Sequence, residues 1–207
     1  MPERAFMTFL LIPLAVTVAG CADTSRPRQP GMPYRTISTE PWRDTEAARQ
    51  KSREGLRHLA AGDLEAATRS FKQALSADVK FGPAHNNLGK VYYLQNDLYN
   101  AAWEFKYAID LLPRHAGPHN NLGLVLEASD KLEEAVNSYR EAVSVEPTNI
   151  EYRANLARAL VKRGDKTDEV AILLQQILDQ DDRPQWRSWA KPQLINLQAA
   201  RTGTQPP

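Results

Sequence analysis

The segment His85-Asn86-Asn87-Leu88-Gly89 decides how this chain folds, because it returns as His119-Asn120-Asn121-Leu122-Gly123, 34 residues later. The same offset relates further positions after each copy: Ala101, Phe105, Ala108 and Pro113 map onto Ala135, Tyr139, Ala142 and Pro147. A fixed period of this length indicates one structural unit that is repeated and stacked on itself, since a single unit cannot bury its own apolar face.

Each unit is predicted to be a helical hairpin. Apolar and small residues recur at helical spacing in two runs, and a pair of turn-forming residues separates the runs. The predicted turns are Gly62-Asp63, Asn96-Asp97, Ser129-Asp130 and Gly164-Asp165. Pro113 and Pro147 are expected to end the second helix, because proline disfavours helical geometry in the preceding residue. Gly123 should let neighbouring helices approach closely, and a bulky replacement should force them apart.

A period of 34 with a Leu-Gly pair, then alanine, an aromatic residue, alanine and proline, resembles the tetratricopeptide repeat. The resemblance implies an all-α, right-handed solenoid of about four helical hairpins over residues 43–184. Extending the offset backwards places a first unit at about 48–81. Extending it forwards places a fourth at about 150–184, whose second helix fits only if one residue is inserted near Thr167.

The chain after the repeats is expected to form a capping helix over residues 185–201, followed by a polar tail at 202–207. Trp186 and Trp189 are three residues apart and share a face of this helix. They are expected to cover the open end of the stack, and the alternative is an aromatic patch that binds a partner. Pro192 predicts a kink in the helix.

Residues 1–20 have the pattern of a signal peptide, with Arg4 followed by an apolar run from Ala5 to Gly20. This run is shorter than the roughly 20 residues that a membrane-spanning helix needs. It ends in Val18-Ala19-Gly20-Cys21, which resembles the lipobox of bacterial lipoproteins. The resemblance implies cleavage before Cys21 and acylation of that cysteine, while the alternative is an ordinary secretory signal with an incidental cysteine. Cys21 is the only cysteine, so no intramolecular disulfide competes for it.

Residues 21–42 are expected to form the lipidated cysteine and a flexible tether, because four prolines punctuate a polar composition there. Ala22 stands where some bacteria use aspartate to retain a lipoprotein in the inner membrane. By resemblance the predicted localisation is the cell envelope, lipid-anchored and facing the periplasm, with the outer membrane favoured over the inner one.

The predicted binding surface lies on the first helices of the units, which line the concave face in the family that the chain resembles. Position 6 of each unit carries a polar side chain: Arg53, Asn87, Asn121 and Asn155. The three asparagines can both donate and accept hydrogen bonds. Asparagine ladders in similar proteins bind the backbone of an extended peptide, while the alternative is a role in packing or solvation. The same face carries further bases: Arg49, Lys90, Arg158 and Lys162.

These bases predict a groove for a peptide with acidic side chains or a free C-terminal carboxylate, and the alternative is a solvated face. The resemblance to the carboxylate clamp of some tetratricopeptide domains is partial. Asn87 fits its central asparagine, but Ser52 and Leu56 stand where lysine and asparagine are expected, and Gly117 departs as well.

No catalytic constellation is found in the sequence, and we expect no enzyme activity, cofactor or metal. His85 and His119 occupy equivalent positions one repeat apart, which predicts a packing role. The formal net charge is +1, so no general field would attract nucleic acid. A membrane-anchored periplasmic adaptor or assembly factor that binds a protein partner is therefore expected. The alternatives are an accessory subunit that presents substrate to a cell-envelope enzyme, and an envelope protein that self-assembles through its tryptophan end. Oligomeric state is not predicted.

Overall fold

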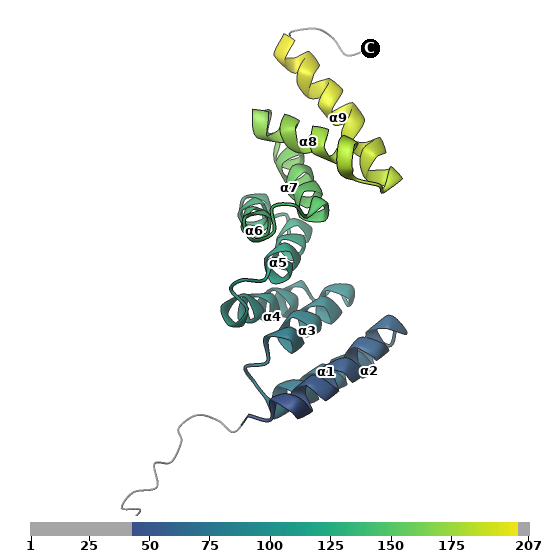
Figure 1. The fold of residues 1–207 in the computed structure, drawn as a ribbon, viewed down its shortest axis with the longest axis vertical. Coiled ribbons are helices and arrows are strands. Elements are labelled where there is room, and N and C mark those ends of the chain that lie inside the picture. Colours follow the sequence, from purple (N-terminus) through teal and green to yellow (C-terminus); the bar gives the residue numbers. More distant parts are fainter. Residues whose placement is uncertain (1–42, 203–207) are drawn as a thin grey trace, which may run out of the picture. The chain divides into compact units, whose positions relative to one another are not determined.

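The computed structural model describes residues 43–202, and the predicted signal peptide, the predicted tether and residues 203–207 of the predicted polar tail lie outside them. Thr202, the first residue of the predicted tail, is the last residue of the C-terminal helix. Within the described residues all regular structure is helical (Figure 1). The helices are α1 (Thr45–Ala60), α2 (Leu64–Ala77), α3 (Gly82–Leu94), α4 (Leu98–Leu111), α5 (Ala116–Ala128), α6 (Leu132–Val145), α7 (Ile150–Arg163), α8 (Asp168–Gln180) and α9 (Pro184–Thr202).

These helices form four hairpins, α1–α2, α3–α4, α5–α6 and α7–α8, followed by α9 (Figure 1). Each helix packs against the next one along the chain, and the first helices of successive hairpins also contact each other. The second helix of one hairpin therefore packs on the first helix of the following hairpin, which is how a repeat solenoid buries its apolar surface. The predicted all-α, right-handed solenoid of helical hairpins is confirmed.

Hairpin turns recur with the same backbone geometry one period apart. Gly62, Asn96, Asp130 and Gly164 all have positive φ values, between 58° and 95°. Glycine, asparagine and aspartate are the residues that adopt this left-handed conformation most readily. In the first two hairpins the next residue, Asp63 or Asp97, then caps the second helix by accepting a hydrogen bond from a backbone N–H. The turn residues thus reverse the chain and start the next helix.

An aromatic ring packed over a glycine joins the two helices of each of the first three hairpins. A Cβ atom added at Gly123 would lie 2.6 Å from the Tyr139 ring, and one added at Gly89 would lie 2.7 Å from the Phe105 ring. Tyr139 and Phe105 are almost completely buried. The glycines are therefore needed for their small size, as expected from the sequence, and the aromatic rings fill the space that they leave.

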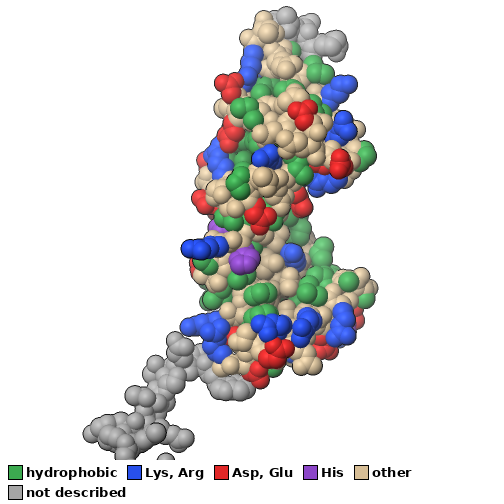
Figure 2. All heavy atoms as spheres, in the orientation of Figure 1, with side chains coloured by type: hydrophobic (Ala, Val, Ile, Leu, Met, Phe, Trp, Pro, Cys, Tyr) green, Lys and Arg blue, Asp and Glu red, His purple; other side chains and the backbone are tan. Residues whose placement is uncertain are grey.

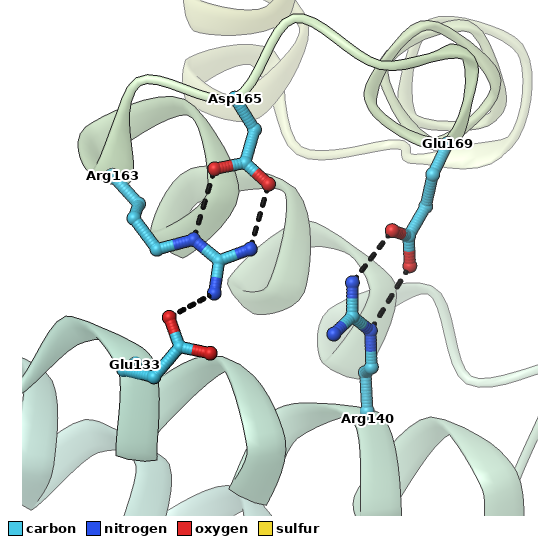
Figure 3. Close-up of polar contacts among 5 residues, drawn as sticks. All are labelled: Glu133, Arg140, Arg163, Asp165 and Glu169. Carbon is cyan, nitrogen blue, oxygen red and sulfur yellow. Dashed lines mark hydrogen bonds and ion pairs between the residues drawn. The ribbon is translucent and has the colours of Figure 1, made fainter.

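The fourth hairpin follows the same plan with a longer turn. Its buried residues Val170, Leu174 and Ile177 correspond to Ala135, Tyr139 and Ala142 at an offset of 35, so one extra residue stands before α8. Figure 3 shows ion pairs that tie this hairpin to α6: Arg163 bridges Asp165 and Glu133, and Arg140 binds Glu169. The guanidinium of Arg163 thereby connects the lengthened turn to the preceding hairpin.

The last helix, α9, closes the C-terminal end of the stack by packing on α8. Its residues Ala190, Leu194 and Leu197 join the main core cluster. Trp186 and Trp189 are partly buried against the same core and meet edge to face, with ring centroids 5.6 Å apart. Pro192 lies inside the helix. Within residues 43–202, no helix has the length and apolar character needed to cross a membrane.

Candidate peptide-binding surface

The first helices α1, α3, α5 and α7 form the surface on which the sequence predicts binding, here called the inner face. Two hollows lie on it. One, the amide hollow, measures about 330 Å³ and lies at the N-terminal ends of α3, α5 and α7, where Asn86, Asn87, Pro118 and Tyr152 line it. The other, the cation hollow, measures about 370 Å³ and is lined by Tyr93, Leu124, Glu127, Ala128, Arg158 and Lys162.

The four residues at position 6, Arg53, Asn87, Asn121 and Asn155, are here called the ladder, and Asn87 is the one best placed to bind a ligand. Its side chain lines the amide hollow, is only partly buried, and makes no hydrogen bond with any other described residue. Both the donor and the acceptor of this amide can therefore bind the backbone of a peptide. Lys90 lies one helical turn further along α3, is exposed, and forms no ion pair within residues 43–202.

The other two ladder asparagines hold neighbouring hairpins together. Asn121 donates from Nδ2 to Oδ1 of Asn86 at 2.9 Å, and Asn155 donates to Oδ1 of Asn120 at 2.8 Å. Asn155 and Asn120 are both buried. The ladder thus does not present equivalent amides to solvent: Asn155 has a structural role, Asn121 is partly engaged, and Asn87 is accessible. Position 5 of one repeat pairs with position 6 of the next.

Arg158 is also engaged within the protein. Its Nε and Nη2 atoms donate to the two carboxylate oxygens of Glu127 at 3.0 and 2.9 Å. The Tyr139 hydroxyl donates to the same carboxylate at 2.9 Å, and the Arg158 guanidinium lies 5.2 Å from the Trp186 ring centroid. Burial alone would raise the pKa of Glu127, but the hydrogen bonds and charge of Arg158 outweigh it and lower the pKa. The carboxylate therefore stays ionised and neutralises Arg158.

The remaining predicted bases have acidic neighbours that the sequence analysis did not include. Arg49 and Arg53 both pair with Glu46 on the exposed surface of α1. Lys162 lies 3.9 Å from Asp130 and 3.4 Å from the backbone oxygen of Glu127. On the face drawn in Figure 2, acidic side chains are interspersed among the basic ones, although several Lys and Arg side chains stand together in the lower part of the view. The positive potential of the inner face is therefore weaker than the count of bases predicts. Among the predicted bases, Lys90 is the one that forms no ion pair within residues 43–202.

The two repeat-related histidines have different surroundings. His85 contacts Glu104 through Nδ1 at 2.6 Å and the Val79 carbonyl through Nε2 at 2.8 Å. Burial opposes protonation of His85, but these two acceptors raise its pKa overall. In contrast, burial lowers the pKa of His119, against a smaller effect of Glu141. His85 is buried and His119 is partly buried. No group of three metal-ligating side chains occurs in the part of the chain that the structure describes.

Sequence reasoning missed several residues that shape these surfaces. Glu127 neutralises the cation hollow, and its partner is 31 residues away, so no local pattern identifies it. Asn86 and Asn120 are the first residues of the two repeated Asn-Asn pairs in the sequence. Considering both asparagines of each pair would have suggested a hydrogen bond between successive repeats. Exposed aromatic residues on α4 were also missed. Cys21, the predicted lipidation site, lies outside the described residues.

Comparisons with known proteins agree with this architecture. Tetratricopeptide repeat family models match residues 52–116 and 126–189, together more than half of the chain. The fold is similar to that of YrrB, described as a TPR protein with an unusual peptide-binding site, with a TM-score of 0.65 and 20% identity over 77% of this chain and 80% of that one. No curated protein sequence matches significantly.

Two further solved structures have similar folds. The first TPR of Spaghetti (RPAP3), bound to an HSP90 peptide, gives a TM-score of 0.58 at 20% identity over 60% of this chain and 98% of that one. MamA gives a TM-score of 0.60 at 21% identity over 66% of this chain and 79% of that one. At these identities the likeness shows the fold alone. With the repeat period, the stacked hairpins and both family models in agreement, this chain belongs to the tetratricopeptide repeat family.

Proposed function

We propose that this protein is a membrane-anchored adaptor or assembly factor of the bacterial cell envelope, which binds a partner protein as an extended peptide on its inner face. The observation that carries the proposal is the accessible amide of Asn87 in a hollow between successive first helices. A peptide backbone needs both a donor and an acceptor, and Asn87 supplies both. The HSP90 peptide bound in the RPAP3 structure and the peptide-binding site described for YrrB support a ligand of this kind.

The charge of the inner face supports a peptide with one carboxylate on the Lys90 side of Asn87, because the exposed Glu146 also lines the amide hollow and repels further acidic groups there. Lys90 is exposed and lies three residues further along α3, on the same face. Arg158 and Lys162 contribute less, because Glu127 and Asp130 lie beside them. An exposed pair adds modest binding energy of about 0.2–1 kcal/mol, so the main-chain contacts must supply most of the affinity.

A crosslinking pull-down from intact cells tests the peptide site. The variant carries Asn87→Ala and Lys90→Ala, which remove accessible groups without breaking contacts between helices. A matched control carries Asn196→Ala and Lys191→Ala on the exposed surface of α9. We expect one envelope partner to be captured by the native chain and the control and lost by the variant. Equal capture by all three chains would reject the inner face as the site. An enzyme as the partner would favour the accessory-subunit alternative.

The membrane anchor is supported by the lipobox-like residues Val18–Cys21 and needs its own test. We expect the native chain to incorporate labelled palmitate and to fractionate with membranes, with the outer membrane favoured by Ala22. Cys21→Ala should abolish both while leaving the helical repeats folded. Release of an unlabelled native chain into the soluble periplasm would instead identify an ordinary secretory signal.

A further inference from the structure

A stripe of exposed aromatic residues runs along α4. Tyr99, Trp103 and Tyr107 expose 72%, 50% and 51% of their surface. They are four residues apart, so they lie on one face of the helix, and together they are called the aromatic ridge. Trp103 and Tyr107 also contact each other, with ring centroids 6.0 Å apart. This ridge belongs to the second helix of its hairpin, so it is separate from the inner face.

The ridge is peculiar to the second repeat. The equivalent positions are Glu65, Arg69 and Gln73 in α2, and Glu133, Asn137 and Glu141 in α6. The same fold is thus built in neighbouring repeats with polar side chains at these positions. Tyr107 also stacks on His85, with ring centroids 5.4 Å apart. The neighbouring repeats nevertheless fold without aromatic residues at these positions, and leaving half or more of three large side chains in water favours association. The departure from the repeat pattern therefore points to a binding role.

A hollow of about 200 Å³ lies directly beside the ridge, between α4 and the start of α6. Tyr99 and Trp103 form one side, and Leu126, Lys131 and Glu134 contribute to the other. An apolar cavity of about 150 Å³ is enough to bind benzene, so this hollow has room for one aromatic ring. Each copy of the chain therefore carries both a projecting ring and a recess that can receive one.

We propose that the aromatic ridge binds a second copy of this chain, through a two-fold axis parallel to α4. Such an axis places ridge against ridge, with a ring of each copy directed at the hollow of the other. It also places α2 of one copy opposite α6 of its partner. The exposed cations Arg69 and Lys72 of α2 then face the acidic side chains Glu134 and Glu141 of α6.

The alternative two-fold axis, perpendicular to α4, has poorer charge complementarity. It would place α6 against α6, so that Glu134 and Glu141 of the two copies approach each other. Like charges in an interface are unfavourable, while the opposite charges of the parallel arrangement steer association and set its orientation. Arg69 is 67% exposed and only loosely paired with Glu65 at 3.9 Å, so it remains accessible to the second copy.

The size of the ridge indicates a weak dimer. At roughly 200 Å² for each ring, the exposed fractions correspond to about 350 Å² per copy, or about 700 Å² for the pair. A stable interface buries at least about 1,000 Å², so the rings alone do not suffice and the contacts between α2 and α6 are also needed. We therefore expect dissociation in the micromolar range, and weaker association at high salt.

Sedimentation equilibrium of the fragment Pro41–Pro207 tests the proposal, because this compact unit contains all the described helices. The native fragment should follow a monomer–dimer equilibrium. Trp103→Asn, which installs the residue of the equivalent position in α6, should weaken dimerisation at least tenfold. Ile172→Asn, at a 57% exposed position on α8, is the matched control and should leave the equilibrium unchanged. Circular dichroism confirms that each variant is folded.

Charge reversal tests the orientation of the two copies. Arg69→Glu alone and Glu141→Arg alone should each weaken self-association, because both edges of each variant's dimer then carry like charges. An equimolar mixture of the two variants should regain the dimer, because both edges of the mixed dimer pair opposite charges. A native fragment that stays monomeric at several hundred micromolar would overturn the proposal, as would a dimer unaffected by Trp103→Asn. Failure of the mixture to associate more strongly than either variant would overturn the parallel arrangement.

Discussion

Replacing Gly123 with alanine tests the contact between a glycine and an aromatic ring that joins the two helices of a hairpin. The added Cβ would lie 2.6 Å from two ring atoms of Tyr139. The ring cannot easily move away, because Tyr139 is completely buried and its hydroxyl donates a 2.9 Å hydrogen bond to Glu127. The two helices of the α5–α6 hairpin must therefore separate, or the bond to Glu127 must lengthen.

The expected cost follows from two opposing effects. Overpacking a well-packed core costs about 1–3 kcal/mol. Alanine in place of glycine inside a helix gains up to about 1 kcal/mol, because glycine loses more backbone freedom on folding. We therefore expect Gly123→Ala to lower the free energy of unfolding by about 1–2 kcal/mol. For a chain of this size the corresponding fall in Tm is about 2–8 °C.

Thermal unfolding of the fragment Pro41–Pro207, followed by circular dichroism, measures this effect. Gly117→Ala is a matched control in the same helix, because its added Cβ would have no neighbour closer than the Tyr152 hydroxyl at 3.9 Å. It should leave the Tm unchanged or raise it slightly. In a Tyr139→Ala background, Gly123→Ala should no longer destabilise. Equal Tm values for the two glycine variants in the native background would refute the proposed role of the ring.

Two further predictions concern buried charges. The pKa of His85 is raised in the folded state, so its stabilising effect is complete below its unfolded pKa of about 6.5 and is lost as the pH rises through the folded value. Urea unfolding from pH 5.5 to 9 should show this loss, and Glu104→Gln should abolish it; an unchanged slope would contradict the Glu104 contact. Arg158→Ala should lower the free energy of unfolding by about 2 kcal/mol, because the partly buried Glu127 carboxylate loses its main partner. The exposed control Arg49→Ala should cost less than about 0.5 kcal/mol, and equal losses in urea unfolding would rule out a special role for Arg158.

The candidate site could be predicted only in part. Asn87 and Lys90 are accessible on the inner face, as their positions in the repeat imply. Asn155 has the same repeat position as Asn87 but is buried, because Asn120 of the preceding repeat approaches it from α5. The first repeat has Ser52 where Asn86 and Asn120 stand in the next two, so Asn87 has no equivalent asparagine partner. Asparagines at equivalent positions of two repeats thus differ in solvent accessibility, because the residues that they face in the preceding repeat differ.

The sequence by itself determined the repeating unit. The period of 34 and the turn residues from Gly62 to Gly164 arise within one hairpin, so each repeat restates them. The tertiary structure alone decided which side chains meet between hairpins and which stay in water. The bond from Arg158 to Glu127 and the exposure of Trp103 depend on how closely successive helices approach, and no single repeat contains that information.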